Sequence, residues 1–276
     1  MPQFQLHAKA PEAASVRALL HAWQVPKAWI AVLRRTQGVL INGQYRTFNQ
    51  PVEAGASVTL NFSAPGTDYY RPQQLPLAVV YEDNQLLIVN KPAGQKPHPN
   101  RPDEEGTLMN AAAGYLAPRP VYITHRLDML TSGLTIIAKD PISQGIINRQ
   151  LAAKTAARTY TALVPPGLPQ SGTIDAPIGA DPEDKRKRRV RCDGLRAVTH
   201  FRVVAKHGDV ARLALTLETG RTHQLRVHLA HLGYPIIGDP LYGGRAAPRL
   251  MLHASSLTLI KPLTSENLTT TSPAPF

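Results

Sequence analysis

The chain has 276 residues, 43% of them hydrophobic, which is enough for one large domain or a domain plus a small module. Lys and Arg number 31 against 19 Asp and Glu, and the net charge of +12 favours a polyanionic partner, nucleic acid ahead of a membrane surface. The only cysteine, Cys192, excludes an internal disulfide and fits a reducing compartment. No secretory signal and no apolar run near the roughly 20 residues of a membrane span are present. We therefore expect a cytoplasmic protein without a membrane partner, acting as a monomer.

The first 62 residues predict a small α+β module. Residues 13–36 hold two short helical patterns interrupted at Pro26. Residues 39–41 read as a strand that enters an Asn-Gly turn, and residues 57–62 alternate as a half-buried strand. This order, with GVLING at 38–43 and VEAGA at 52–56, resembles the small RNA-binding module of ribosomal protein S-four, although Ala56 replaces the usual Asp. The alternative is a small cap without an RNA role.

Residues 63–76 have the proline-rich composition of a semi-rigid linker, and a second domain follows over residues 77–276. Because the expected strands outnumber the helices and often follow one another directly, we predict an α+β fold with a mixed, mainly antiparallel sheet and flanking helices. Strands are expected at 78–81, 85–90, 133–138, 158–164, 198–204, 210–217 and 250–259, and helices at 107–116, 141–153 and 222–232.

Residues 125–133, with the sequence HRLDMLTSG, are the most informative part of the chain. Arg126 and Asp128, two apart, share one face of an extended segment and so could reach one substrate together. The run resembles the H-R-L-D-x-x-T-S-G signature of the RluA-type pseudouridine synthases, which detach uracil from its ribose within RNA, rotate it and rejoin it through carbon. The resemblance implies the pseudouridine synthase fold and an isomerisation, so no metal or organic cofactor is expected. Ribosomal large-subunit RNA is favoured as substrate, and tRNA remains open.

The resemblance makes Asp128 the catalytic carboxylate, which either attacks the sugar carbon or removes a ribose proton. Residues 219–228, TGRTHQLRVH, match a second family segment whose arginine lies against that Asp, and we assign this place to Arg221. Thr222 is predicted to cap the helix that follows, so Arg221 would lie where the helix dipole favours an anion. An ordinary structural ion pair is the alternative. Leu225, on the apolar face of this helix, and His125 are expected in the substrate pocket.

Three further residues gain roles by resemblance. Arg126 would fill the space left when the target base is flipped out of the RNA stack, and otherwise is a surface arginine. Tyr160 would pack against the uracil ring and could take up the C5 proton, and otherwise is a core tyrosine. Lys91 lies in the family's N-K-P-x-G loop and could contact phosphate, while a rigid turn with a solvated lysine is equally open. The segment 238–243, GDPLYG, is interpreted as a structural turn that caps the site.

Residues 185–191, KRKRRVR, place six cations in seven positions, between acidic residues that mark a loop or hairpin end. A charge run is usually only solvated. On an RNA-modifying scaffold, Lys185, Arg186, Lys187 and Arg188 would instead meet phosphates. A zinc site, a serine hydrolase and a dinucleotide enzyme fit poorly, because the required ligand spacings and motifs are absent. The serious alternative is an RNA-binding or ribosome-assembly protein that keeps the scaffold without turnover.

Overall fold

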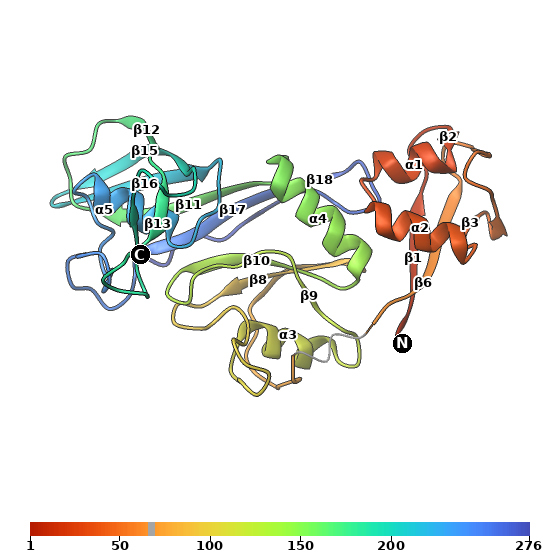
Figure 1. The fold of residues 1–276 in the computed structure, drawn as a ribbon, viewed down its shortest axis with the longest axis horizontal. Coiled ribbons are helices and arrows are strands. Elements are labelled where there is room, and N and C mark those ends of the chain that lie inside the picture. Colours follow the sequence, from red (N-terminus) through yellow and green to blue (C-terminus); the bar gives the residue numbers. More distant parts are fainter. Residues whose placement is uncertain (66–69) are drawn as a thin grey trace.

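The computed structural model describes residues 1–65 and 70–276. A small N-terminal part lies beside a much larger one that is built on a long, twisted sheet (Figure 1). Part of the predicted linker, residues 66–69, falls outside the described residues. None of the described helices is long and apolar enough to cross a membrane.

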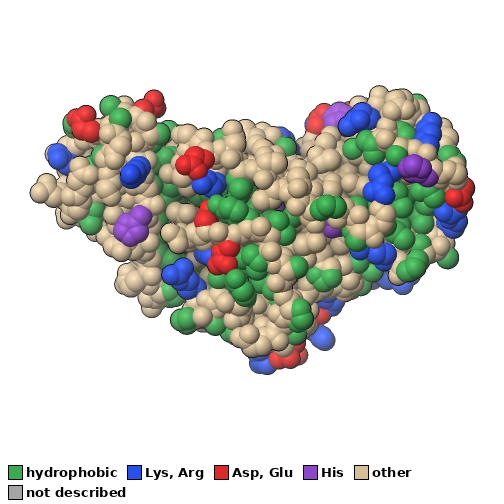
Figure 2. All heavy atoms as spheres, turned by 180° about the vertical axis from the view of Figure 1, so that it is seen from behind, with side chains coloured by type: hydrophobic (Ala, Val, Ile, Leu, Met, Phe, Trp, Pro, Cys, Tyr) green, Lys and Arg blue, Asp and Glu red, His purple; other side chains and the backbone are tan. Residues whose placement is uncertain are grey.

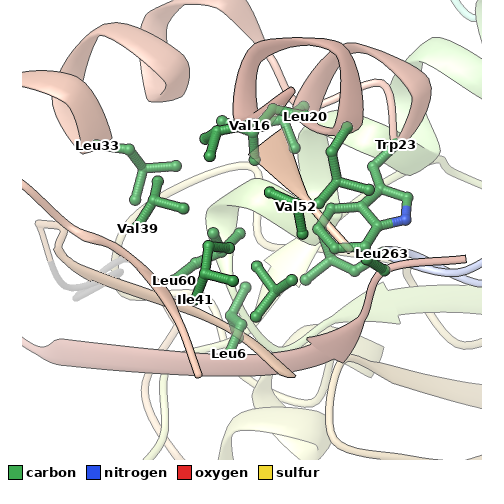
Figure 3. Close-up of a cluster of buried hydrophobic side chains, with 14 of the residues drawn as sticks. Leu6, Val16, Leu20, Trp23, Leu33, Val39, Ile41, Val52, Leu60 and Leu263 are labelled. Carbon is green, nitrogen blue, oxygen red and sulfur yellow. The ribbon is translucent and has the colours of Figure 1, made fainter. Parts of the chain in front are cut away.

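The N-terminal part is a four-stranded antiparallel sheet in the order β1-β6-β3-β4, with two helices packed on it. Its buried side chains, such as Leu20, Ile41 and Leu60, fill the space between the helices and the sheet (Figure 3). Strand β1 was not predicted, because only one of its residues, Leu6, is buried. The elements are β1 (Gln3–Lys9), β2 (Ala14–Ser15), α1 (Val16–Ala22), α2 (Lys27–Arg35), β3 (Val39–Ile41), β4 (Gln44–Tyr45), β5 (Pro51–Val52) and β6 (Ser57–Ser63).

The larger part is built on a ten-stranded sheet whose path runs β12-β15-β16-β11-β17-β10-β8-β7, with β18 beside β17 and β9 beside β10. Every pairing is antiparallel except β10 with β17, so the expected mixed, mainly antiparallel sheet is confirmed. Its elements are β7 (Val79–Glu82), β8 (Leu86–Lys91), α3 (Leu108–Leu116), β9 (Tyr122–Ile123), β10 (Ser132–Ala138), α4 (Pro141–Ala153), β11 (Ala157–Val164), β12 (Ser171–Asp175), β13 (Ile178–Ala180), β14 (Arg188–Val190), β15 (Val198–His207), β16 (Val210–Leu217), α5 (Gln224–His231), β17 (Leu252–Ile260) and β18 (Asn267–Thr271).

The central strands β8 and β10 are buried on both faces, which explains their continuous apolar sequences. In β8, Ile88 packs with Ile147 of α4 on one side of the sheet, whereas Leu87 packs with Met109 of α3 on the other. Strand β10 alternates in the same way, and it leads directly out of the HRLDMLTSG run. The signature is thus attached to the most deeply buried strands of the sheet.

The small part is docked firmly on the large one. Its apolar core includes Ile142 and Ile146 of α4. It also includes Leu263 of the loop after β17 (Figure 3). Arg149, one turn further along α4, donates from Nη1 to the carbonyl oxygens of Gln24 and Val25, at 3.3 and 3.4 Å. The two parts therefore share one hydrophobic cluster.

This shared cluster predicts that α4 holds the N-terminal part in place. Replacing Ile146 by Ala keeps a good helix former but leaves a cavity in a site only 2% exposed. The free energy of unfolding should fall by about 2–5 kcal/mol in a urea titration. Leu195→Ala, at a side chain 63% exposed, is the control and should change little. Equal losses in the two variants would contradict the docking described here.

Candidate active site

A cleft of about 440 Å³ opens where the HRLDMLTSG run, strand β11 and the start of α5 meet. Of the residues singled out in the sequence, it is lined by His125, Arg126, Asp128, Tyr160, Arg221 and Leu225. Lys91 and the Lys185–Arg188 cluster do not line it. The structure therefore gathers both family segments, nearly 100 residues apart in sequence, at one site.

The loop that carries Asp128 is fixed from both sides. The Thr131 amide donates to the Asp128 carbonyl at 3.1 Å, and the Gly94 amide donates to the Met129 carbonyl at 2.9 Å. Strand β10 begins at once, and its Gly133 has φ +116° with no room for a side chain, since a Cβ would lie 2.4 Å from the backbone of Ala254. The terminal glycine of the signature is thus required where β10 and β17 run parallel and close together.

The cation beside Asp128 is Arg226, so the predicted pairing with Arg221 is wrong. The Arg226 Nη1 atom lies 3.9 Å from Asp128 Oδ2, and its side chain is only 2% exposed. The same guanidinium donates two hydrogen bonds to the buried carboxylate of Asp239, from Nε at 2.7 Å and from Nη2 at 2.8 Å. Burial lowers the pKa of Arg226, but the hydrogen bonds and charge of Asp239 outweigh it, and the pKa rises overall.

Arg221 points elsewhere because the helix begins later than the sequence suggested. The N-cap of α5 is His223, in a left-handed conformation with φ 58°, and not Thr222. Arg221 lies in the exposed turn before it and donates from Nε to the Arg196 carbonyl at 3.0 Å. It contributes to the cleft wall but is not the partner of the carboxylate.

The segment 238–243 does more than cap the site, since Asp239 is the hydrogen-bonded partner of Arg226. Gly238, at φ +79°, allows this turn to form, because a Cβ there would lie 1.8 Å from the Arg249 carbonyl oxygen. Sequence reasoning missed both residues of the pair. In the structure all residues from 224 to 229 are buried, and a cation inside a buried helix requires a buried partner.

Tyr160 lies in β11 at the floor of the cleft, and its side chain is 4% exposed. The neighbouring strand β17 contains an irregularity at this point, because Thr159 pairs with Ser256 whereas Tyr160 pairs with Ala254. Bulges of this kind re-aim side chains beside active sites. Leu225 and Leu252 supply apolar walls next to the ring. The floor can therefore accept a flat, apolar face such as that of a nucleobase.

His125 and Arg126 form another part of the rim. The Ile136 amide donates to His125 Nε2 at 3.1 Å, and burial, followed by the charge of Arg158, holds the pKa of His125 well below its usual value. The imidazole is therefore neutral and structural. Arg126 is exposed, and its Nη1 donates to His98 Nε2 at 3.3 Å, so its guanidinium stands at the mouth of the cleft.

The predicted phosphate contact of Lys91 is wrong, because its side chain is fully buried at 0% exposure. Its Nζ donates to the carbonyl oxygens of Pro92, Gln95 and Met129, at 2.8, 2.9 and 3.0 Å. Burial lowers the pKa of Lys91 to about 7, against the opposing charge of Asp128. Lys91 thus ties the N-K-P-x-G loop to the residue after the carboxylate and offers nothing to RNA.

The basic cluster Lys185–Arg188 lies at the tip of the hairpin formed by β13 and β14, in agreement with the predicted loop. Lys185 and Arg186 are exposed, although Arg186 also binds Asp184 through Nε and Nη2 at 2.9 and 2.7 Å. The Arg188 amide donates to the Tyr242 hydroxyl at 3.0 Å, so this hairpin is attached to the cleft wall. Elsewhere, basic and acidic side chains are scattered over the back of the molecule (Figure 2).

A half-exposed carboxylate beside a buried guanidinium, a tyrosine floor and a basic rim are suited to chemistry on an anionic polymer with flat rings. Among the described residues, no group of three His, Cys, Asp or Glu side chains could hold a metal ion. The carboxylate, the tyrosine and the basic rim together fit an RNA-directed enzyme.

Comparisons with known proteins agree. Residues 85–231 match the family model "RNA pseudouridylate synthase", and residues 4–58 match "RluD ribosomal pseudouridine synthase N-terminal domain". The "Ribosomal large subunit pseudouridine synthase D" of Escherichia coli K12 is 35% identical over 272 residues, covering 90% of this chain and 82% of that one. The corresponding Xanthomonas campestris protein is 38% identical over 256 residues, covering 86% and 77%. The solved structure of "Human RNA Pseudouridylate Synthase Domain Containing 1" has a TM-score of 0.62 at 28% identity and covers 78% and 87%.

The chain belongs to the RNA pseudouridylate synthase family, and it is an isomerase that forms pseudouridine in RNA. The family resemblance seen in the sequence is confirmed for both the large part and the N-terminal part.

The geometry separates the two arginines experimentally. Arg226→Met leaves the carboxylate of Asp239 buried without its partner, and loss of one member of a buried pair costs about 3–5 kcal/mol. We expect lower stability together with loss of turnover. Arg221→Met, at an exposed side chain, should stay as stable as the wild type and keep turnover at saturating RNA. Urea unfolding and a pseudouridine assay check both variants, and the reverse order of effects would refute the assignment of Arg226.

Proposed function

We propose that this protein converts specific uridines of ribosomal large-subunit RNA to pseudouridine. The names of its relatives state this substrate for them, and their similarity extends through the N-terminal part. The observation that carries the catalytic half of the proposal is the position of Asp128, 29% exposed in the cleft and 3.9 Å from a buried guanidinium. A protein that only bound RNA would have no use for a carboxylate placed beside a buried guanidinium in an open cleft.

In the proposed reaction, the bond between uracil N1 and ribose C1′ breaks and a bond from uracil C5 to C1′ forms. Asp128 acts on the ribose, either by attack on the sugar carbon or by removal of a ribose proton, and both routes need the ionised carboxylate that Arg226 favours. The detached uracil stays between Leu225, Leu252 and the ring of Tyr160 while it rotates. Tyr160 is placed to take up the C5 proton, and N1 gains one, so the product is an isomer of the substrate.

We propose that RNA is held by phosphate contacts around this cleft. Arg126 stands at the mouth, where a guanidinium can stack in the space of a flipped base. Lys185, Arg186, Lys187 and Arg188 extend the basic rim on one hairpin. Residues 1–62 would form an RNA-binding module, residues 63–76 a linker and residues 77–276 the catalytic domain. We further propose that the protein works in the cytoplasm, where a reducing environment suits the single exposed cysteine, Cys192, and that it works as a monomer.

The catalytic role of Asp128 is tested by Asp128→Asn. The amide is nearly isosteric but can neither attack nor accept a proton as a carboxylate does. Pseudouridine formation should fall below detection, while RNA affinity and the melting temperature stay near the wild-type values. Residual turnover within about tenfold of wild type would remove Asp128 from this role and favour the non-catalytic alternative. Mapping pseudouridine in cellular RNA with and without the gene identifies the substrate, and loss of a tRNA site alone would exclude the ribosomal proposal.

The basic hairpin is tested by the salt dependence of binding. Each phosphate neutralised on a single strand adds about −0.7 to the slope of log affinity against log salt. Replacing Lys185, Arg186, Lys187 and Arg188 by Gln should make the slope shallower by roughly one to three units if two to four of them touch phosphate. Turnover at saturating RNA should change little, because these side chains do not line the cleft. An unchanged slope would mean that the cluster is only solvated.

A further inference from the structure

His223 lies beside the Asp128 carboxylate and has no role in the reaction proposed above. Its Nε2 atom is 4.0 Å from Asp128 Oδ2, and its side chain is 15% exposed. The other ring nitrogen, Nδ1, lies 2.8 Å from the hydroxyl of Tyr242. Tyr242 in turn lies under the guanidinium of Arg226, whose Cζ is 5.0 Å from the ring centre.

The hydrogen bonds in this group favour one direction of donation along the chain from Arg188 to His223. The Arg188 backbone amide can only donate, so the Tyr242 oxygen accepts from it at 3.0 Å. Burial raises the pKa of Tyr242, so its hydroxyl keeps a proton, and this proton is free to go to His223 Nδ1. Burial also lowers the pKa of His223, and this outweighs the opposing charge of Asp128, so the imidazole is neutral. If Nδ1 accepts, the single ring proton must be on Nε2, the nitrogen that faces Asp128.

We infer that His223 is a positioning residue for the reaction, whose Nε2–H is held toward Asp128 by the hydrogen-bond chain from Arg188 through Tyr242. The present separation of 4.0 Å is longer than a hydrogen bond, but catalytic hydrogen bonds are commonly long in substrate-free structures and tighten in the complex. Donation from a neutral imidazole orients the carboxylate and favours its ionised form without adding a second full charge beside Arg226.

The backbone places His223 for this task. Its left-handed conformation, φ 58°, turns the chain sharply out of the preceding loop and into α5. This left-handed conformation is energetically unfavourable for a histidine, and such backbone strain is common at functional sites. The chain of donors begins at Arg188, which is both the last residue of the basic cluster and the first residue of β14. The hairpin proposed to bind phosphate is therefore connected by two hydrogen bonds to the residue next to the carboxylate.

The tautomer is measured without RNA. In long-range proton–nitrogen spectra of the full-length protein labelled with ¹⁵N-histidine, His223 should show a pyridine-type Nδ1 and a protonated, pyrrole-type Nε2. Tyr242→Phe removes the hydroxyl and should shift this pattern toward a mixture of tautomers. A wild-type spectrum with the proton on Nδ1, or a pattern unaffected by Tyr242→Phe, would overturn the inference. These spectra do not depend on activity, so they stand apart from the proposed function, which fails instead if the wild type forms no pseudouridine in ribosomal RNA.

Turnover tests whether the tautomer matters. His223→Leu should lower kcat by about ten- to a hundredfold with KM nearly unchanged, as expected for loss of a hydrogen bond to a charged group. His223→Gln keeps an N–H donor at a similar reach and should recover most of kcat. Tyr242→Phe should lose about two- to tenfold, and the double variant with His223→Leu should be no slower than His223→Leu alone, because the tyrosine acts through the histidine.

Two controls separate this role from a structural one. His231→Leu changes an exposed histidine at the other end of α5, and Tyr115→Phe removes the hydroxyl of an exposed tyrosine on α3. Both should keep the wild-type kcat. Wild-type kcat in His223→Leu, or independent losses that multiply in the double variant, would show that His223 does not position Asp128.

Discussion

The buried guanidinium of Arg226 is the interaction on which the site depends. Removing a cation from water costs several kcal/mol, and here the two hydrogen bonds that the guanidinium donates to Asp239 compensate for this cost. The carboxylate of Asp239 alone balances the charge of the Arg226 guanidinium. The second, Asp128, lies at 3.9 Å without a direct hydrogen bond and keeps 29% of its side chain exposed. Asp239 thus holds the guanidinium in place and leaves the Asp128 carboxylate open to the cleft.

The site forms beside the one parallel strand pairing that the described residues show in the large sheet. Strand β10 leaves the loop of Asp128 and runs beside β17 for only two residue pairs, Ser132 with His253 and Gly133 with Ala254. The Ser132 hydroxyl contacts His253 Nδ1 at 2.7 Å and also receives a hydrogen bond from Arg249. These contacts join the β8–β10 side of the sheet to the side that begins with β17 and β11. The Thr-Ser-Gly end of the signature therefore connects β10 to β17, whereas the residue proposed to do the chemistry is the Asp that precedes it.

Much of the large sheet could be predicted from the sequence, because its central strands are apolar and its helices have clear ends. Helix α4 is found at residues 141–153 and β16 at 210–217, as predicted. Strands β12 and β18 were missed for a physical reason: each buries a single residue, so it has no apolar periodicity to detect. Their pairing depends on the strands already present, which local sequence does not describe.

The site was predicted in its residue types and cleft, but the choice of arginine was wrong. Arg221 and Arg226 occur in one matched segment, and only the phase of the helix decides which of them is buried. That phase is set by the left-handed turn at His223, a conformation that no pattern of apolar residues reveals. The prediction for Lys91 was wrong because it expected an exposed side chain. A lysine in a Pro/Gly loop is usually solvated, whereas here the ammonium group is buried and donates to three carbonyl groups.

Helix α4 and strand β10 connect the N-terminal part with the loop of Asp128. The N-terminal core packs on Ile142 and Ile146 of α4, and Asp140 caps that helix through the Ser143 amide at 2.8 Å. Strand β10 ends at Ala138, just before the cap, and begins just after the loop of Asp128. If the N-terminal part binds RNA, as proposed above, the RNA is held on the same packed framework that carries the cleft, because the two parts share one hydrophobic cluster.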